Sequence, residues 1–424
     1  MTSTSSVLSP SASSRPLAGV RTLVRGTTGL TSGVAFGLLT SILVTLLASS
    51  SAPTPLYAVY QARWGFSPVA VTVVFGVYAV AVLVSLLVLG ALSDHIGRRP
   101  VLTAALVAQA GVMLLFATAS GLDVLLVARV LQGFATGAAV AAIGAALVDL
   151  HPGRGPVANA AGAMGGTASG ALISALFVEL LPAPTQLVYL VLLGLFLLQA
   201  AGVRRIAETS SRVPGAMRSL RPTLALPGPV RGDGERAADR AGFYASLGPS
   251  LAAIVDGSHS TILGGATLFV LAASGALTVL AFHRTNPRTF ALAGTGLIIV
   301  GVTLLLAAVP ARSPILFFMG TAIAGAGFGG GFQGGLRTIL PLAGPAERAG
   351  VIAVVYVISY LALGLPAIGA GVLVVHTTVT QTAQLFGFGV IALAASTAAG
   401  LLLGARRTRP RETNAANIGC LATR

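Results

Sequence analysis

The chain has few charged residues and almost no cysteine. Only 9% of its 424 residues are charged, whereas a soluble domain carries about 25%. Its single cysteine, Cys420, excludes a disulfide framework within the chain and a cysteine metal site. All 26 basic residues are arginine. Because lysine is absent, the glycine-rich phosphate-binding loop of ATPases, which requires a lysine, is excluded. The five histidines lack ligand spacing, and no catalytic constellation is evident, so we expect no metal, no cofactor and no enzyme activity.

Apolar residues dominate instead. They make up 55% of the chain, and the mean hydropathy is +0.89. A soluble core cannot use this much apolar surface, so the excess must face lipid. A soluble enzyme, a disordered protein and a nucleic-acid-binding protein are therefore excluded, despite the net charge of +15. The composition, rich in Arg, Ala, Gly and Val, is typical of a GC-rich bacterial genome.

The apolar runs predict membrane-spanning helices. A helix needs roughly 20 mostly apolar residues to cross the hydrocarbon layer. Eleven runs meet this length: 32–52, 69–92, 101–119, 124–149, 157–180, 186–205, 262–282, 290–309, 314–338, 349–374 and 384–404. A twelfth run, 241–256, is short and contains Pro249. We interpret it as a shortened seventh helix, with a decayed helix as the alternative.

The arginines predict the orientation. Arginine-rich short loops stay in the cytoplasm. If the N-terminus is cytoplasmic, 23 arginines fall inside, only Arg63 and Arg312 fall outside, and Arg129 lies within a span. The arginines at 204–240 and at 284–288 both belong inside, so an even number of crossings must join them. This parity requires a crossing at 241–256 in addition to the one at 262–282.

These spans predict an all-α integral membrane protein with twelve transmembrane helices in two six-helix halves. Two such halves are typical of transporters that bind solute near the bilayer midplane. Both termini are expected in the cytoplasm, and the protein is expected to be a monomer in the cytoplasmic membrane. The expected segments are a disordered tail (1–31), an N-terminal bundle (32–206), a linker (207–240), a C-terminal bundle (241–404) and a basic tail (405–424).

The loop between the second and third spans carries the most specific motif. It reads Gly-Ala-Leu-Ser-Asp-His-Ile-Gly-Arg-Arg-Pro over residues 90–100. This resembles the signature loop of the major facilitator superfamily, and it falls at the same place in the topology. Gly90 favours close helix approach, Gly97 favours a tight turn, and Asp94 is placed to pair with Arg98 and Arg99. The resemblance implies that these five residues form a latch between the halves that biases one access state.

Arg129 is an arginine within the fourth span, in a segment that resembles the family's Arg-x-x-x-Gly pattern and ends at Gly133. Because a charge in the membrane is costly, Arg129 should face protein or water and have a partner. One interpretation is an electrostatic element near the solute path that influences proton transfer. The alternative is a packing arginine that extends outward toward Asp123 or Glu179.

Two spans are rich in glycine. Gly162, Gly166 and Gly170 repeat every four residues in the fifth span, followed by Ser174, which predicts close helix packing. The family's antiporters carry a Gly-Pro pair in this span, and this chain lacks it. The tenth span holds seven glycines between residues 325 and 335. That density suits either a bending gate or simple tight packing.

Several polar residues are candidates for a substrate cavity. Ser41, Thr45 and Ser49 form one stripe on the first span, although hydroxyls can also bond to their own helix. Gln333, Tyr356 and Tyr360 lie at membrane depth in later spans. Tyr57, Tyr60 and Trp64 lie near the outer end of the first span and are typical of an interfacial aromatic belt.

The resemblance implies a secondary transporter that moves a small molecule by alternating access. Few charges in the spans favour a hydrophobic or amphipathic solute that is uncharged or cationic. Efflux of drugs or metabolites is the first expectation, and sugar or metabolite uptake is the alternative. Proton coupling is an open partner prediction, with Asp149, Glu179 and Asp256 as its weak candidates. A non-transporting sensor or a degenerate copy on this fold is the alternative from another class.

Overall fold

The computed structural model describes residues 30–210, 214–219, 261–339, 369, 373 and 376–407. Every regular element within these ranges is a helix, and ten helical segments are long and apolar enough to span a membrane. The chain is therefore a multi-pass membrane protein. The short helix predicted at 241–256, nearly all of the predicted span at 349–374, the predicted tails and most of the linker lie outside the described residues.

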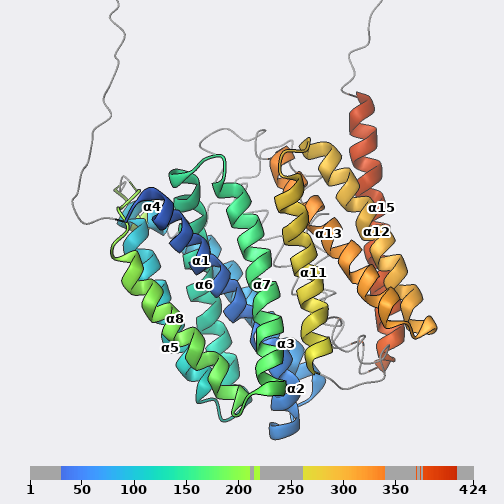
Figure 1. Cartoon of the computed structure of the whole chain (residues 1–424), viewed down its shortest axis with the longest axis horizontal. Helices are drawn as coiled ribbons and strands as arrows, with labels where there is room; N and C mark the ends of the chain where they lie inside the picture. The colour runs from blue at the N-terminus through green and yellow to red at the C-terminus, as the bar shows by residue number, and fades with distance from the viewer. Residues whose placement is uncertain are drawn as a thin grey trace, which may run out of the picture.

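The N-terminal half is a bundle built around apolar side chains of α1, α5, α6 and α8 (Figure 1). Leu39, Leu106, Ile143 and Phe196 are fully enclosed in this core. The helices follow one another across the bundle with short connections, and α4 is a single turn that precedes α5. They are α1 (Ser32–Ser51), α2 (Pro53–Trp64), α3 (Pro68–Leu89), α4 (Leu92–Ile96), α5 (Arg98–Ala117), α6 (Leu122–Leu150), α7 (Gly155–Leu180) and α8 (Pro184–Val203).

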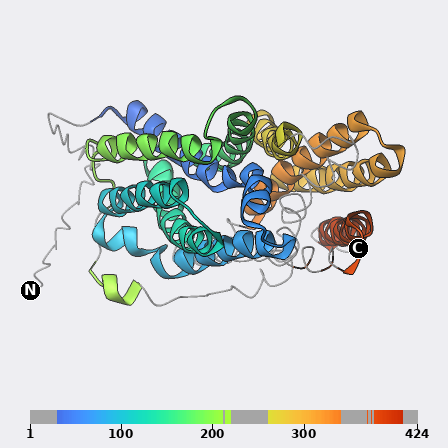
Figure 2. The ribbon, with the colours of Figure 1, turned by 90° about the horizontal axis from the view of Figure 1, so that it is seen from below.

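The C-terminal half lies beside this bundle, as Figure 2 shows from below. Its described helices are α11 (Thr261–Phe282), α12 (Pro287–Ala311), α13 (Pro314–Ile339) and α15 (Val379–Arg407). α13 packs against both α11 and α12, and α15 packs against α12. A further short helix, α9 (Ala216–Ser219), contacts α4 in the N-terminal half.

The glycines of α13 are used for close packing on two sides. Carbon atoms built at the Cβ positions of Gly327 and Gly334 would lie 2.6 Å and 2.8 Å from backbone oxygens of α12. A Cβ on Gly329 would collide with the backbone of Gly275 in α11. Because two neighbouring backbones occupy this space, the glycine density serves tight packing in the conformation described, and the bending gate has no support here.

The two halves meet along α7 and α11. A Cβ on Gly265 of α11 would lie 2.5 Å from the Cβ of Ala175 and 2.9 Å from the carbonyl oxygen of Ala171. Further along, Ala276 and Val279 of α11 pack with Ala160, Ala161 and Met164 of α7. Small residues thus bring the two helices close together at both ends of this seam.

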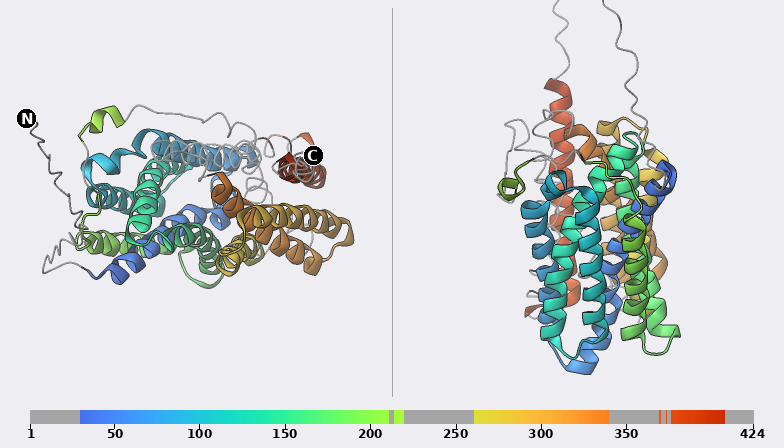
Figure 3. Two further views of the ribbon diagram at one scale, coloured as in Figure 1. Left: turned by 90° about the horizontal axis from the view of Figure 1, so that it is seen from above. Right: turned by 90° about the vertical axis from the view of Figure 1, so that its left-hand side faces the viewer.

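The helix ends form two faces. α4 and the end of α15 lie on one face of the molecule, and α2 lies on the opposite face (Figure 1, and the right-hand view of Figure 3). The helix connections that hold Arg98, Arg154, Arg204, Arg284 and Arg288 belong to the face of α4, whereas Arg63 and Arg312 belong to the face of α2. The arginine asymmetry of the sequence therefore divides the structure in the same way.

Candidate functional site

The signature loop forms a network of charges at the start of α5. Gly97 has φ 106° and ψ 149°, a conformation that L side chains rarely adopt. This turn places Arg98 one helical turn after Asp94, and their side chains pair at 3.1 Å. Nε of Arg98 also donates to Oδ2 of Asp149, at the end of α6, at 2.9 Å. Arg98 thus holds α4, α5 and α6 together.

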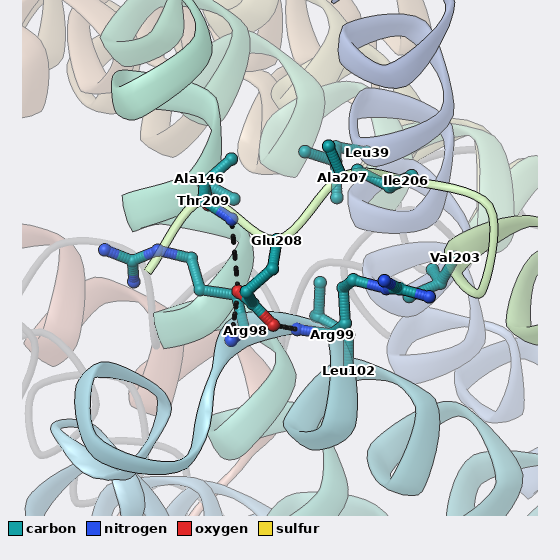
Figure 4. Close-up of a pocket in the computed structure, with 10 residues that line it drawn as sticks. All are labelled: Leu39, Arg98, Arg99, Leu102, Ala146, Val203, Ile206, Ala207, Glu208 and Thr209. Carbon is teal, nitrogen blue, oxygen red and sulfur yellow. Dashed lines mark hydrogen bonds between the residues drawn. The ribbon is translucent and has the colours of Figure 1, made fainter. Parts of the chain in front are cut away.

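Glu208 completes this network from the chain that leaves α8. Its carboxylate accepts from the backbone N–H groups of Arg98 at 2.9 Å and Arg99 at 3.2 Å. Those N–H groups have no partner within the helix at its first turn, and a negative charge there is favoured by the helix dipole. Figure 4 shows Glu208 above the start of α5, between the two arginines. The carboxylate also accepts from the N–H groups of Thr209 and Ser210, and Ser210 Oγ donates to the carbonyl of Asp94.

All these contacts lie within the N-terminal half and the chain that leaves it. Arg99 donates to the carbonyl of Arg204, in the turn after α8. The atoms nearest to a Cβ built on Gly90 belong to Leu86 of the same span, not to a second helix. Of the other half, the structure describes residues 261–339, 369, 373 and 376–407. The latch between halves at Gly90, Asp94, Gly97, Arg98 and Arg99 therefore stays a prediction.

A second polar cluster surrounds an interruption of the first span at Ala52. Pro53 and Pro55 have no N–H group, so the carbonyls of Ser49 and Ser51 lose their partners in the next turn. The Ser49 carbonyl instead accepts from Nε2 of Gln132 in α6 at 3.0 Å. Side chains from other helices also reach the next carbonyls. Arg129 donates to the carbonyl oxygen of Ser50 at 3.0 Å, and the hydroxyl of Ser174 in α7 donates to the carbonyl oxygen of Ala52 at 2.6 Å.

Arg129 is the centre of this cluster. Its side chain is buried, and Nε donates to the hydroxyl of Tyr57 at 2.9 Å. A second nitrogen donates to Oε1 of Gln132 at 2.6 Å. The guanidinium carbon lies 5.2 to 5.6 Å from the ring centres of Tyr57, Tyr78 and Phe116, within the range of a cation–π interaction. Arg129 therefore faces protein and has neutral partners, and none of the hydrogen bonds described here goes to Asp123 or Glu179.

The expected aromatic belt at the end of the first span is wrong for two of its three members. Tyr57 and Tyr60 are buried, with 4% and 1% exposure. Tyr57 bonds to Arg129, and the hydroxyl of Tyr60 lies 3.3 Å from that of Tyr189 in α8. Trp64 stacks on Tyr60, and their ring centres lie 4.7 Å apart.

Two of the three residues in the polar stripe of the first span, Thr45 and Ser49, are buried in the N-terminal bundle, whereas Ser41 is exposed. Thr45 accepts from Gln199 of α8 at 2.9 Å, and Ser41 and Ser49 donate to carbonyls of their own helix. Gln333 is buried in α13, and Tyr356 and Tyr360 lie outside the described residues. A cavity role for these residues stays a prediction.

The glycines singled out for packing lie against other helices. A Cβ on Gly133 would lie 2.8 Å from the carbonyl oxygen of Tyr78 in α3. Gly162, Gly166 and Gly170 face α1, where the nearest side chain to Gly162 is that of Leu43, at 3.3 Å from a built Cβ. α1 and α7 are therefore held close together beside the interruption at Ala52, and α3 and α6 are held close in the same way.

Two residues of these clusters were missed by the sequence interpretation. Glu208 lies among the arginines of the predicted linker and was not predicted as a site residue. An acidic residue just after the sixth span is a signal that could have drawn attention to it. Gln132 stands three residues after Arg129, a spacing that puts both side chains on one helix face.

Comparisons with known proteins agree with this fold. The family model described as Major Facilitator Superfamily matches residues 26–233, which include all the helices of the N-terminal half. Two crystal structures of the nucleoside transporter NupG, one of them of a point mutant, are similar to the chain. The mutant gives a TM-score of 0.66 at 12% identity over 88% of this chain and 99% of that one. The other gives 0.63 at 13% identity over 87% and 99%.

Among curated proteins, no sequence matches the chain. At such low identity, the likeness to the solved structures concerns the fold alone. The family model carries the assignment, together with the signature loop at residues 90–100 and its position between α3 and α5. Residues 26–233, the matched part of the chain, belong to the major facilitator superfamily.

Proposed function

We propose that this protein is a secondary transporter that moves a small molecule across the membrane by alternating access. The observation that carries the proposal is the seam between α7 and α11, because it joins the two helix bundles through close contacts of small residues such as Gly265 and Ala175. Two bundles that meet at such a seam can tip about it and open a central path to either side in turn.

The charge inside the N-terminal bundle bears on the solute. Arg129 is a buried cation held by neutral groups, whereas Asp94, Asp123, Asp149, Glu179 and Glu208 lie at helix ends or in connections of the described chain. A positive interior disfavours a cationic solute. The proposal is therefore narrowed from an uncharged or cationic solute to an uncharged or anionic one.

The direction of transport is a separate part of the proposal. The fold is shared with a nucleoside transporter, and this supports uptake of a polar, uncharged metabolite as much as efflux of an amphipathic one. The arginine distribution supports an orientation with the face of α4 toward the cytoplasm. We further propose that the protein is a monomer in a bacterial cytoplasmic membrane.

Counterflow in proteoliposomes tests transport directly. Vesicles loaded with unlabelled uridine should accumulate radiolabelled uridine faster than empty vesicles do, and parallel panels of sugars and amphipathic dyes test the other classes. Gly265→Leu should reduce the rate at least tenfold, because the side chain would force α7 and α11 apart. Gly296→Leu is the matched control, since nothing lies within 4 Å of its Cβ position.

Two outcomes would count against the proposal. Saturable solute binding without counterflow in any panel would favour a sensor on this fold. Equal rates in both glycine variants would show that the seam does not take part in the cycle. Proton coupling is tested in the same vesicles with an imposed pH gradient.

A further inference from the structure

On the face of α4, the described part of the C-terminal half carries arginines and no acid. Arg284 lies in the turn between α11 and α12, Arg288 is the second residue of α12, and Arg337 lies in the last turn of α13. Residues 261–339 and 376–407 contain no aspartate or glutamate. Both ion pairs among the described residues belong to Arg98 in the other half. No carboxylate of the described chain therefore balances these three charges.

Backbone carbonyls hold two of these arginines in place. A terminal nitrogen of Arg288 donates to the carbonyl oxygen of Leu401 in α15 at 2.9 Å, and Nη1 of Arg337 donates to that of Thr285 at 3.1 Å. Both arginines are half-buried. A guanidinium has five N–H groups, and a carbonyl that accepts one of them does not neutralise its charge. Arg288 and Arg337 therefore keep both charge and donors for an anion.

The N-terminal half has a similar arrangement to which an acid is added. Arg99 is the second residue of α5 and donates to the carbonyl of Arg204 after α8, as Arg288 donates to α15. In that half, Glu208 brings a carboxylate to the start of α5. At the start of α12, the neutral side chain of Asn286 accepts from the N–H group of Arg288 at 3.0 Å. An acid thus fills a place in one half that has none in the described part of the other.

Exposed apolar side chains stand next to these arginines. Phe282, two residues before Arg284, is 55% exposed. Leu402 follows the residue whose carbonyl Arg288 binds, and it is 54% exposed. Basic groups beside exposed apolar groups at the end of a membrane span match a phospholipid, which has a charged headgroup and acyl chains. A soluble anion would gain nothing from the apolar groups.

We propose that Arg284, Arg288 and Arg337 bind the phosphate group of an anionic phospholipid, whose acyl chains lie along Phe282 and Leu402. Anionic headgroups attract arginines near the membrane surface, and guanidinium groups form strong, charge-assisted hydrogen bonds to phosphate oxygens. The site adds a lipid ligand to the protein and does not depend on the proposed transport function.

Acids elsewhere in this part of the sequence offer no net negative charge. Glu347 and Glu412 follow α13 and α15 and lie outside the described residues. In the sequence, Glu347 stands directly beside Arg348, and Glu412 stands directly beside Arg411. An anionic phospholipid brings a full negative charge to the membrane surface, so it complements the three arginines better than either of these neighbouring pairs.

A single tryptophan placed at the site tests the proposal. In a Trp64→Phe background, which removes the only tryptophan, Phe282→Trp reports on the arginines. Ile315→Trp is the control at the other end of the same half, where the side chain is 75% exposed. Phosphatidylcholine nanodiscs contain a minor fraction of brominated phosphatidylglycerol or brominated phosphatidylcholine, because bromine quenches tryptophan at short range. We expect phosphatidylglycerol to quench Phe282→Trp more strongly and the two lipids to quench Ile315→Trp equally.

Charge variants separate lipid binding from a structural effect. Each arginine near an anionic surface contributes about fivefold in affinity, so Arg284→Gln with Arg288→Gln should lower the preference for phosphatidylglycerol by about 25-fold. Lysine at both positions should keep most of the preference, because the charge remains. Arg312→Gln is the control on the face of α2 and should leave the preference unchanged. If lysine and glutamine remove the preference equally, the arginines act through the structure and the proposal fails.

Three further outcomes would overturn the proposal. The first is equal quenching of Phe282→Trp by the two lipids when all arginines are present. The second is loss of the preference with inorganic phosphate but not with chloride at matched ionic strength, which would assign the arginines to a free anion. The third is a preference that appears only in Glu347→Gln, because an acid of the chain would then fill the site. None of these results depends on counterflow.

Discussion

Several single side chains in this protein each connect two or more helices. Glu208, Arg98 and Arg129 each contact two or more elements, and Glu208 and Gln132 satisfy backbone groups that the helices themselves leave open. Backbone groups without partners are expensive inside a membrane protein. Polar residues at helix ends and at the interruption of the first span are therefore structural necessities as well as functional candidates.

Glu208→Gln should destabilise the protein. The amide keeps the size of the side chain but loses the charge at the start of α5, so we expect a loss of about 1 kcal/mol of unfolding free energy. Thermal unfolding in detergent measures it as a lower Tm. Glu179→Gln is the control, because that exposed carboxylate lies at the end of α7, where the dipole does not favour it. A Tm of Glu208→Gln equal to that of the wild type would remove the capping role.

Among the helices, the same residue type has different uses. The glycines of α7 face α1, whereas those of α13 are divided between α11 and α12. Two neighbours on opposite sides hold α13 in place, and this explains why its glycine density does not make a gate in this conformation. The first span, with no interior glycine cluster but two prolines, is the helix that is interrupted.

Gly294→Ala and Gly296→Ala form a matched pair on α12. A Cβ at residue 294 would lie 2.7 Å from the carbonyl carbon of Gly330, so alanine there should cost about 1 to 3 kcal/mol. At residue 296 nothing lies within 4 Å, and alanine should be neutral or stabilise the helix by up to about 1 kcal/mol. Chemical unfolding in detergent compares them. If the two variants are equally stable, the contact of α12 with α13 is looser than described.

At the scale of the whole molecule, the arginines and the seam act together. The arginines on the face of α4 are predicted to orient the chain in the membrane, and the proposed cycle uses the seam to let one half tip against the other. The two halves would then present the solute path to the two sides in turn.

Cysteine labelling tests this orientation. In a Cys420→Ser background, Arg63→Cys should react with a membrane-impermeant maleimide on intact spheroplasts, because it lies on the face of α2. Arg154→Cys should react only after permeabilisation. Both side chains are exposed in the structure, so accessibility within the protein is matched. The reverse pattern, or equal labelling of both, would contradict the predicted topology.

The sequence alone determined where the described spans lie, how arginine divides the two faces, and which loop carries the family signature, because hydropathy, charge and turn-forming glycine act locally along the chain. Only the tertiary structure decided which helix each glycine faces, and that Arg129 binds Tyr57 and Gln132 rather than an acid. It also decided that Glu208 caps α5 from 110 residues away. These are contacts between distant segments, so they depend on how the helices pack and not on any local pattern.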